Sequence, residues 1–373
     1  MKNKKWLRPI AFILMLTIAV LGVLQCYGFP QDDYYTNHFT AFDNEGKNLV
    51  DGVLIGTSVV AFSWLTPVAW KDYGLAAYHL SINIQPFGVI PEYLDYAQKK
   101  QDIKYAVVDV HGLRKETIFN SLLTTNFRSA YLRLPDLISR YKILGSLFDF
   151  AEEVYAFYGE PENKDDVVDS KKLSYYLPFV DFHGRWVEGL NKYDFTTVKN
   201  EYLGAVNLAA VFRISDCSNQ TAKWEFGEVQ EIDDFQKSQL QKLVDYANKH
   251  EIKLLFVNTP SFRTLEEQQE MRDIIAYCKN QGYDAIDFTS DEVVEGTGLD
   301  LSTDFFDEGH LNAFGAKKIT DYICEYLIAN DYYTPDHRGD KKYSEWDKAA
   351  EAYSAFYEKG RAYMQNKLGV ELA

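Results

Sequence analysis

From about residue 50 onward, short apolar runs alternate with longer stretches in which apolar residues recur at helical spacing. Apolar runs of about four to eight residues that end at glycine, proline or polar residues predict buried strands. Such runs occur at 51–58, 75–84, 105–110, 252–258 and 283–288. Helical spacing predicts helices at 91–100, 234–250 and 265–280. Because strands separated by helices assemble into parallel sheets, we predict an α/β protein with a flavodoxin-like doubly wound sheet covered on both faces.

The alternation of predicted strands and helices is interrupted at about 115–224, between the third and fourth predicted strands, and we interpret this segment as an insertion. Its acidic stretch 159–172 is poor in apolar residues and predicts an exposed loop. An aromatic run follows, which either faces a substrate cleft or is half-buried core: Tyr175, Tyr176, Phe179, Phe182 and Trp186. The predicted α/β domain spans 31–345, and the helical pattern in 346–373 predicts a helix that packs on it.

The first thirty residues read as a membrane anchor. A basic flank at 2–8 precedes an apolar run at 10–24, which with its margins reaches about 20 residues, the length needed to cross a bilayer. A cleaved signal peptide and a lipoprotein attached at Cys26 are the alternatives, but the residues after Gly22 fit neither cleavage pattern well. Basic residues before the run and acidic residues after it predict a single-pass protein whose main domain lies outside the cytoplasm.

The charge balance excludes one class of partner. The chain has 373 residues, with 39 basic and 55 acidic side chains and a net charge of −16. Four of the basic residues and none of the acidic ones lie in the first thirty residues, so the rest carries −20. Such a surface repels phosphate backbones, and nucleic-acid binding is not expected. No glycine-rich phosphate loop follows a predicted strand, and no cofactor is expected.

The first candidate for chemistry is Ser58, in Gly56-Thr57-Ser58 after the first predicted strand. A serine at a strand-to-helix turn lies at the carboxyl edge of a parallel sheet, where ligands bind. The following helix directs unpaired N–H groups toward this point, and such donors stabilise an oxyanion. Ser58 is therefore a candidate nucleophile; the alternative is that it only caps the helix.

A second candidate lies near the carboxyl end, where Asp307 precedes His310 by three residues in a predicted loop. This spacing lets the carboxylate accept from one imidazole nitrogen while the other nitrogen faces a nucleophile. Asn312 is predicted to close the loop as the N-cap of an apolar-faced helix. A loop ion pair is one alternative; a metal site is another, although one His and two Asp residues do not define it.

Together these segments resemble the SGNH/GDSL hydrolase superfamily, with a serine after the first strand and Asp-x-x-His near the carboxyl end. The closer resemblance is to membrane-anchored extracytoplasmic members of Gram-positive bacteria, proteins similar to the teichoic-acid D-alanylation protein and to polysaccharide O-acetyltransfer proteins. The resemblance covers about 50–330 and rests on segments 55–58, 78–86, 107–109, 255–260 and 307–312. It implies that Ser58 is the nucleophile, His310 the general base and then acid, and Asp307 the residue that orients His310.

The oxyanion donors depart from the family pattern. Where the second conserved block usually has glycine, this chain has Ser81, whose backbone N–H could still serve. The asparagine of the third block is absent from 107–112, which leaves Asn83 and Gln85 as candidate side-chain donors.

Three further residues are candidates for substrate binding. His111 follows the third strand and either lines the site or is a loop histidine with its own partners. His183 and Arg185 either bind an acyl or sugar group or form an internal salt bridge in the insertion.

The resemblance implies a membrane-tethered, extracytoplasmic serine esterase or O-acyltransferase that acts on acyl esters of a cell-envelope polysaccharide or teichoic acid. The implied partners are the polymer, the membrane and a membrane-bound acyltransferase; no metal is expected. The alternative is a non-catalytic SGNH-like scaffold that binds an envelope polysaccharide or a membrane acyltransferase.

Overall fold

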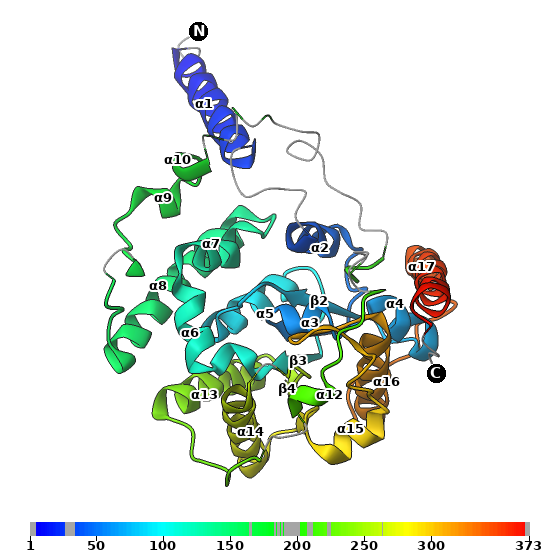
Figure 1. Cartoon of the computed structure of the whole chain (residues 1–373). Coiled ribbons are helices and arrows are strands. Elements are labelled where there is room, and N and C mark those ends of the chain that lie inside the picture. The colour runs from blue at the N-terminus through cyan, green and yellow to red at the C-terminus, as the bar shows by residue number, and fades with distance from the viewer. Residues whose placement is uncertain are drawn as a thin grey trace.

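The computed structural model describes residues 5–26, 34–163, 166–182, 184, 187, 189, 202–206, 212–221, 225–262 and 264–369. Its centre is a parallel sheet with helices on both faces (Figure 1). The strands are β1 (Gly52–Gly56), β2 (Ala77–Ser81), β3 (Tyr105–Asp109), β4 (Lys253–Asn258) and β5 (Ala285–Asp287). The predicted α/β class and all five predicted strands are confirmed.

The strand order is β2-β1-β3-β4-β5, and every neighbouring pair is parallel. This is the strand order of flavodoxin-like doubly wound sheets. In such sheets ligands bind at the topological switch point, where the strand order reverses, which here lies between β1 and β3. The second strand is shorter than the predicted 75–84, because the chain turns at Asn83 and Ile84 after Ile82 donates a hydrogen bond to Gly56.

Alternate strand residues face opposite helical layers, as period-two geometry requires. On β1, Val53 and Ile55 pack in one core and Leu54 in the other. The first layer contains α5 (Ile90–Gln98), α8 (Leu137–Tyr158), α13 (Asp234–Lys249) and α14 (Leu265–Asn280). The second contains α3 (Ser58–Ala61), α4 (Thr66–Val68) and α16 (Ala313–Ala329). Both faces of the sheet are buried by helices, which explains why the strands are nearly continuous apolar runs.

The insertion between β3 and β4 is mostly helical in its described part, with α6 (Lys115–Leu122) and α7 (Thr124–Leu132) before α8. The predicted loop at 159–172 is exposed or half-exposed in its described residues. Tyr175 is 2% exposed and contacts the rings of Phe127 and Phe148, so this ring belongs to the core, whereas Tyr176 is exposed. Phe179 is half-buried, and the Phe182 side chain and Trp186 lie outside the described residues.

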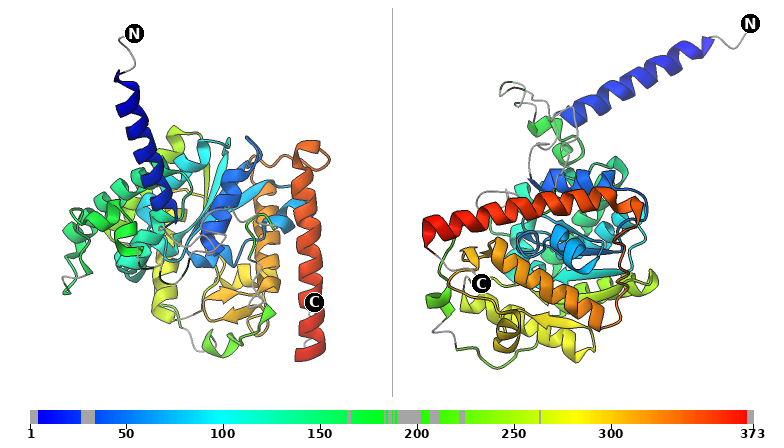
Figure 2. Two further views of the ribbon diagram at one scale, coloured as in Figure 1. Left: turned by 90° about the horizontal axis from the view of Figure 1, so that it is seen from above. Right: turned by 90° about the vertical axis from the view of Figure 1, so that its right-hand side faces the viewer.

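The long helix α17 (Ser344–Leu368) lies along the outer side of the second layer (Figure 2). It packs against α4 and the π-helix η2 (Ala69–Tyr73). Trp346 is buried, contacts the Trp70 ring at 5.3 Å between centroids, and donates its indole N–H to Glu45. The carboxyl end of the chain thus contributes to the core.

Two helices precede the sheet, α1 (Leu7–Cys26) and α2 (Tyr34–Asn44). Large apolar side chains of α1 are exposed, among them Ile10, Phe12 and Leu14. In the part of the chain that the structure describes, no helix combines the length and hydropathy needed to span a bilayer.

Candidate active site

Ser58 is the first residue of α3, directly after β1 at the carboxyl edge of the sheet. The N-cap of α3 is Thr57, in extended conformation and without a side-chain cap hydrogen bond. The Ser58 hydroxyl instead lies 2.9 Å from the imidazole Nε2 of His310. Ser58 is therefore not the cap of α3, and the polar contact of its hydroxyl is with His310.

Gly56 permits the sharp turn before Ser58. A Cβ atom on Gly56 would lie 2.6 Å from Cβ of Asp109 and 2.8 Å from a methyl group of Val60, so a larger residue would separate β1 from β3. The glycine thereby holds the turn against the end of the neighbouring strand.

Asp307 and His310 lie on a short antiparallel hairpin, β6 (Phe305–Asp307) and β7 (His310–Leu311). The segment was predicted as a loop, but Asp307 and His310 are paired strand residues on either side of the Glu308-Gly309 turn. Nδ1 of His310 lies 2.9 and 3.1 Å from the two carboxylate oxygens of Asp307. A carboxylate only accepts, so Nδ1 carries the hydrogen and Nε2 is free to accept from Ser58.

The hairpin is fastened to the next helix by Asn312, the predicted N-cap. Its Oδ1 accepts from the amides of Phe314 and Gly315, while its Nδ2 donates to the carbonyl oxygens of Thr303 and Arg213. Asn312 is fully buried, so these bonds fix the position of the hairpin relative to the start of α16.

Ser81 is directed away from Ser58. The pKa of His79 is lowered to about 4 by burial, so the ring is neutral at neutral pH. Its Nε2 lies 2.6 Å from the Gly204 carbonyl and must donate, which leaves Nδ1 to accept from the Ser81 hydroxyl at 3.0 Å. Because the amide of Ile82 points to β1, the Ser81 amide points to the outer side of this edge strand. The prediction that its N–H serves as an oxyanion donor is not supported by this geometry.

Gln85 and Asn83 have different surroundings. The Gln85 side chain is buried, and its Oε1 accepts from the Gly56 N–H at 3.1 Å. Its Nε2 is buried and has no hydrogen-bond partner in the described structure. Asn83 is exposed at the turn after β2. Of the two candidate donors, Gln85 is the one held beside the turn from Gly56 to Ser58.

If the site cleaves esters, as the family resemblance implies, we expect Gln85→Glu to lower the rate by about 10²-fold, since it keeps an acceptor for Gly56 but removes the N–H donor. Asn83→Ala should change the rate by less than about 3-fold. Steady-state kinetics of both variants, at matched melting temperatures, check this. Equal rates for Gln85→Glu and the unaltered protein would exclude Gln85 as an oxyanion donor.

His111 forms a second Asp–His pair at the same sheet edge. Its Nδ1 lies 2.6 and 2.8 Å from the carboxylate oxygens of Asp109, which also accepts from the His111 amide and from the Thr259 hydroxyl. His111 is 5% exposed, and its Nε2 is buried without a hydrogen-bond partner in the described structure. This arrangement matches the alternative of a loop histidine with its own partners. His183 and Arg185 lie outside the described residues.

Two phenylalanine rings surround the imidazole of His310, and the sequence analysis missed both. The Phe62 ring lies 4.8 Å and the Phe306 ring 5.4 Å from the His310 ring, measured between centroids. The two phenyl rings lie 4.9 Å apart. Phe306 stands next to Asp307 in the motif, and this position is the sequence signal that could have indicated it, since the register shift between Phe305 and Asp307 interrupts the regular alternation of the strand.

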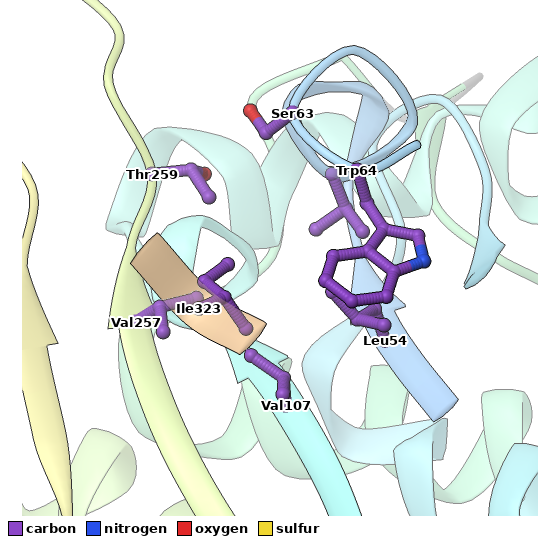
Figure 3. A pocket seen from close by; sticks show the side chains of 8 residues that line it. Leu54, Ser63, Trp64, Val107, Val257, Thr259 and Ile323 are labelled. Carbon is purple, nitrogen blue, oxygen red and sulfur yellow. The ribbon is translucent and has the colours of Figure 1, made fainter. Parts of the chain in front are cut away.

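A small apolar void lies in the second core, below the carboxyl edge of the sheet (Figure 3). It is lined by side chains from three strands, including Leu54 and Val107, and by Trp64. Its volume of about 10 Å³ accommodates roughly one water molecule. Neither Ser58 nor His310 lines it, so the void belongs to the core and not to the site.

Among the described residues, no group of three or more His, Cys, Asp and Glu side chains is placed to hold a metal ion. No protein-family model matches the chain, and no curated protein matches it.

Proposed function

We propose that this chain is a serine esterase or O-acyltransferase of SGNH type that acts on acyl esters of a cell-envelope polymer. The observation that carries the proposal is the continuous hydrogen-bonded chain from Ser58 through His310 to Asp307. Such a chain activates a hydroxyl for attack on a carbonyl carbon.

In the first step, His310 Nε2 takes the Ser58 proton while Oγ attacks the ester carbonyl. The tetrahedral intermediate collapses as the protonated imidazole gives its proton to the leaving alcohol, which leaves the acyl group on Ser58. In the second step, water or a sugar hydroxyl attacks the acyl-enzyme and His310 again transfers the proton. Water as the attacking group gives hydrolysis, and a sugar hydroxyl gives transfer.

Asp307 keeps the hydrogen on Nδ1 and stabilises the imidazolium that forms in each step. The oxyanion would be stabilised by the amides of Ser58 and Val59, which precede the first helical hydrogen bond of α3, from the Val60 amide to the Thr57 carbonyl oxygen, and by Gln85 Nε2. Each such donor contributes about 2.7–4 kcal/mol to the transition state.

We further propose that the first thirty residues anchor the chain in the membrane with the α/β domain outside the cytoplasm. The basic flank and the exposed apolar side chains of α1 support this. A tether holds the enzyme at high effective concentration near a polymer made at the outer membrane face.

A fluorophosphonate that cannot cross membranes tests both parts of the proposal. Added to intact cells that produce the full chain, it should label the protein, and peptide mapping should place the adduct on Ser58. Ser58→Ala should abolish the label. Labelling only after lysis would refute the outward orientation. No labelling in either case, with the chain folded, would favour the non-catalytic scaffold.

A further inference from the structure

The hairpin that carries Asp307 and His310 also presents an aromatic side chain to the outside. Phe305 is fully buried, and the next residue on β6, Phe306, is half-buried. Phe306 contacts the rings of His310 and Phe62 but belongs to neither hydrophobic core. Phe62, at the end of α3, packs partly on the first core. We call Phe62 and Phe306 together the aromatic wall.

The wall stands beside the reacting groups. The Phe306 ring lies nearly parallel to the imidazole of His310, at 15°, and the Phe62 ring is tilted by 55°. A single half-exposed phenyl ring is common on protein surfaces. Two such rings against the base of an active site are in a position to contact whatever group is attached to the ester.

The rim of the site is acidic. The Asp307 side chain is 47% exposed, and Glu308 and Asp216 are exposed. The pKa of the neighbouring Cys217 thiol is raised to about 11, first by burial and then by Glu308, Asp216 and Asp307, so these carboxylates converge on one place. With the net charge of −16, the field at this rim repels anionic groups.

The void behind Phe62 is small. Phe62, Leu311 and Val206 line a cavity of about 10 Å³, room for about one water molecule. A long acyl chain does not fit in this cavity. The Phe62 and Phe306 rings are inclined to each other by 45° and do not form one plane, and each ring is half-buried. The exposed part of a phenyl ring suits the C–H face of a sugar ring, an apolar surface with polar edges.

We propose that the aromatic wall binds an uncharged sugar ring of the ester-bearing polymer, and that the acidic rim selects against polymers linked by phosphate. The inference rests on the proposed function and narrows it to neutral polysaccharides. Phenyl rings stack on the flat apolar face of amphipathic groups such as sugars. The hydroxyl groups at the edge of the sugar can then contact the polar rim of the site.

Binding to the full chain with Ser58→Ala tests the inference without requiring turnover. The probe is acetylated xylotriose, with affinity measured by calorimetry. Phe306→Ala should raise Kd by about 10-fold, and Phe306→Leu by about 5-fold, since leucine is apolar but not flat. Phe306→Trp should stay within about 2-fold. Phe157→Ala, which removes an exposed ring on α8, is the matched control and should have no effect.

The charge selection is tested with an acetylated glycerol-phosphate trimer in the same assay. At low salt it should bind at least about 10-fold more weakly than the xylotriose, and the difference should shrink with Asp216→Asn combined with Glu308→Gln, or with added salt. Phosphate-polymer binding equal to or tighter than sugar binding would overturn the inference, as would equal affinities of the Phe306→Leu, Phe306→Ala and unaltered proteins. If sugar binding follows the predictions but the protein with Ser58 intact turns over no ester, the proposed catalysis fails and the sugar site stands.

Discussion

Ser58→Ala should lower ester turnover by at least about 10³-fold, measured as kcat/KM on a soluble acetyl ester. The variant loses the oxygen that attacks the ester in the proposed mechanism, while the proposed oxyanion donors and the position of His310 remain. His310→Ala should cost a similar factor, because it removes Nε2, the nitrogen that lies 2.9 Å from the Ser58 hydroxyl and would take its proton in the proposed mechanism. The double variant should be no slower than either single variant, since the residues of such a chain act as one unit.

Melting temperatures provide the control for this series, because a loss of folding also lowers turnover. Asp307→Asn should retain the fold and lose somewhat less activity than Ser58→Ala, since it disturbs only the tautomer and orientation of His310. Full activity in Ser58→Ala would place the nucleophile elsewhere and remove the basis of the proposed mechanism.

Asp109→Ala should reduce the free energy of unfolding by about 3 kcal/mol or more, measured by urea denaturation. Its carboxylate is fully buried and accepts from the amide and Nδ1 of His111 and from the hydroxyl of Thr259. The alanine variant leaves these three donors buried without an acceptor at the end of a central strand. Each such group costs about 1–3 kcal/mol.

The pair of Asp307 and His310 is the matched control. The Asp307 side chain is 47% exposed, so Asp307→Ala should change the free energy of unfolding by less than about 1 kcal/mol while activity falls. The two aspartates therefore separate a mainly structural pair from the proposed catalytic one. A loss below about 1 kcal/mol for Asp109→Ala would contradict the structural role of the buried pair.

The strands could be predicted from sequence because the central sheet is buried on both faces. Residues 53–55 are all apolar, although they alternate between two separate cores, so the run itself marks the strand. The Ser58 turn and the Asp307–His310 pair were also predictable, since both depend on short-range spacing. Their meeting at 2.9 Å depends on the order of the strands, which residue spacing alone does not determine.

The parts that sequence reasoning missed depend on long-range contacts. The Ser81 hydroxyl faces His79 because Gly204, 125 residues beyond His79, occupies the other nitrogen of that ring. The aromatic wall joins Phe62 and Phe306 from distant parts of the chain. His111 is held by Asp109, two residues away, but its burial comes from neighbouring elements that the local sequence does not reveal.

The hairpin that carries Asp307 and His310 also sets when the site can exist during synthesis. Ser58 emerges from the ribosome early, and its partner His310 follows 252 residues later. His310 lies two residues before Asn312, the N-cap of α16, so nearly the whole α/β domain must be made before the Ser58 hydroxyl can meet His310. In the proposed mechanism Ser58 of the nascent chain is therefore inert, and labelling of Ser58 would report completion of the fold.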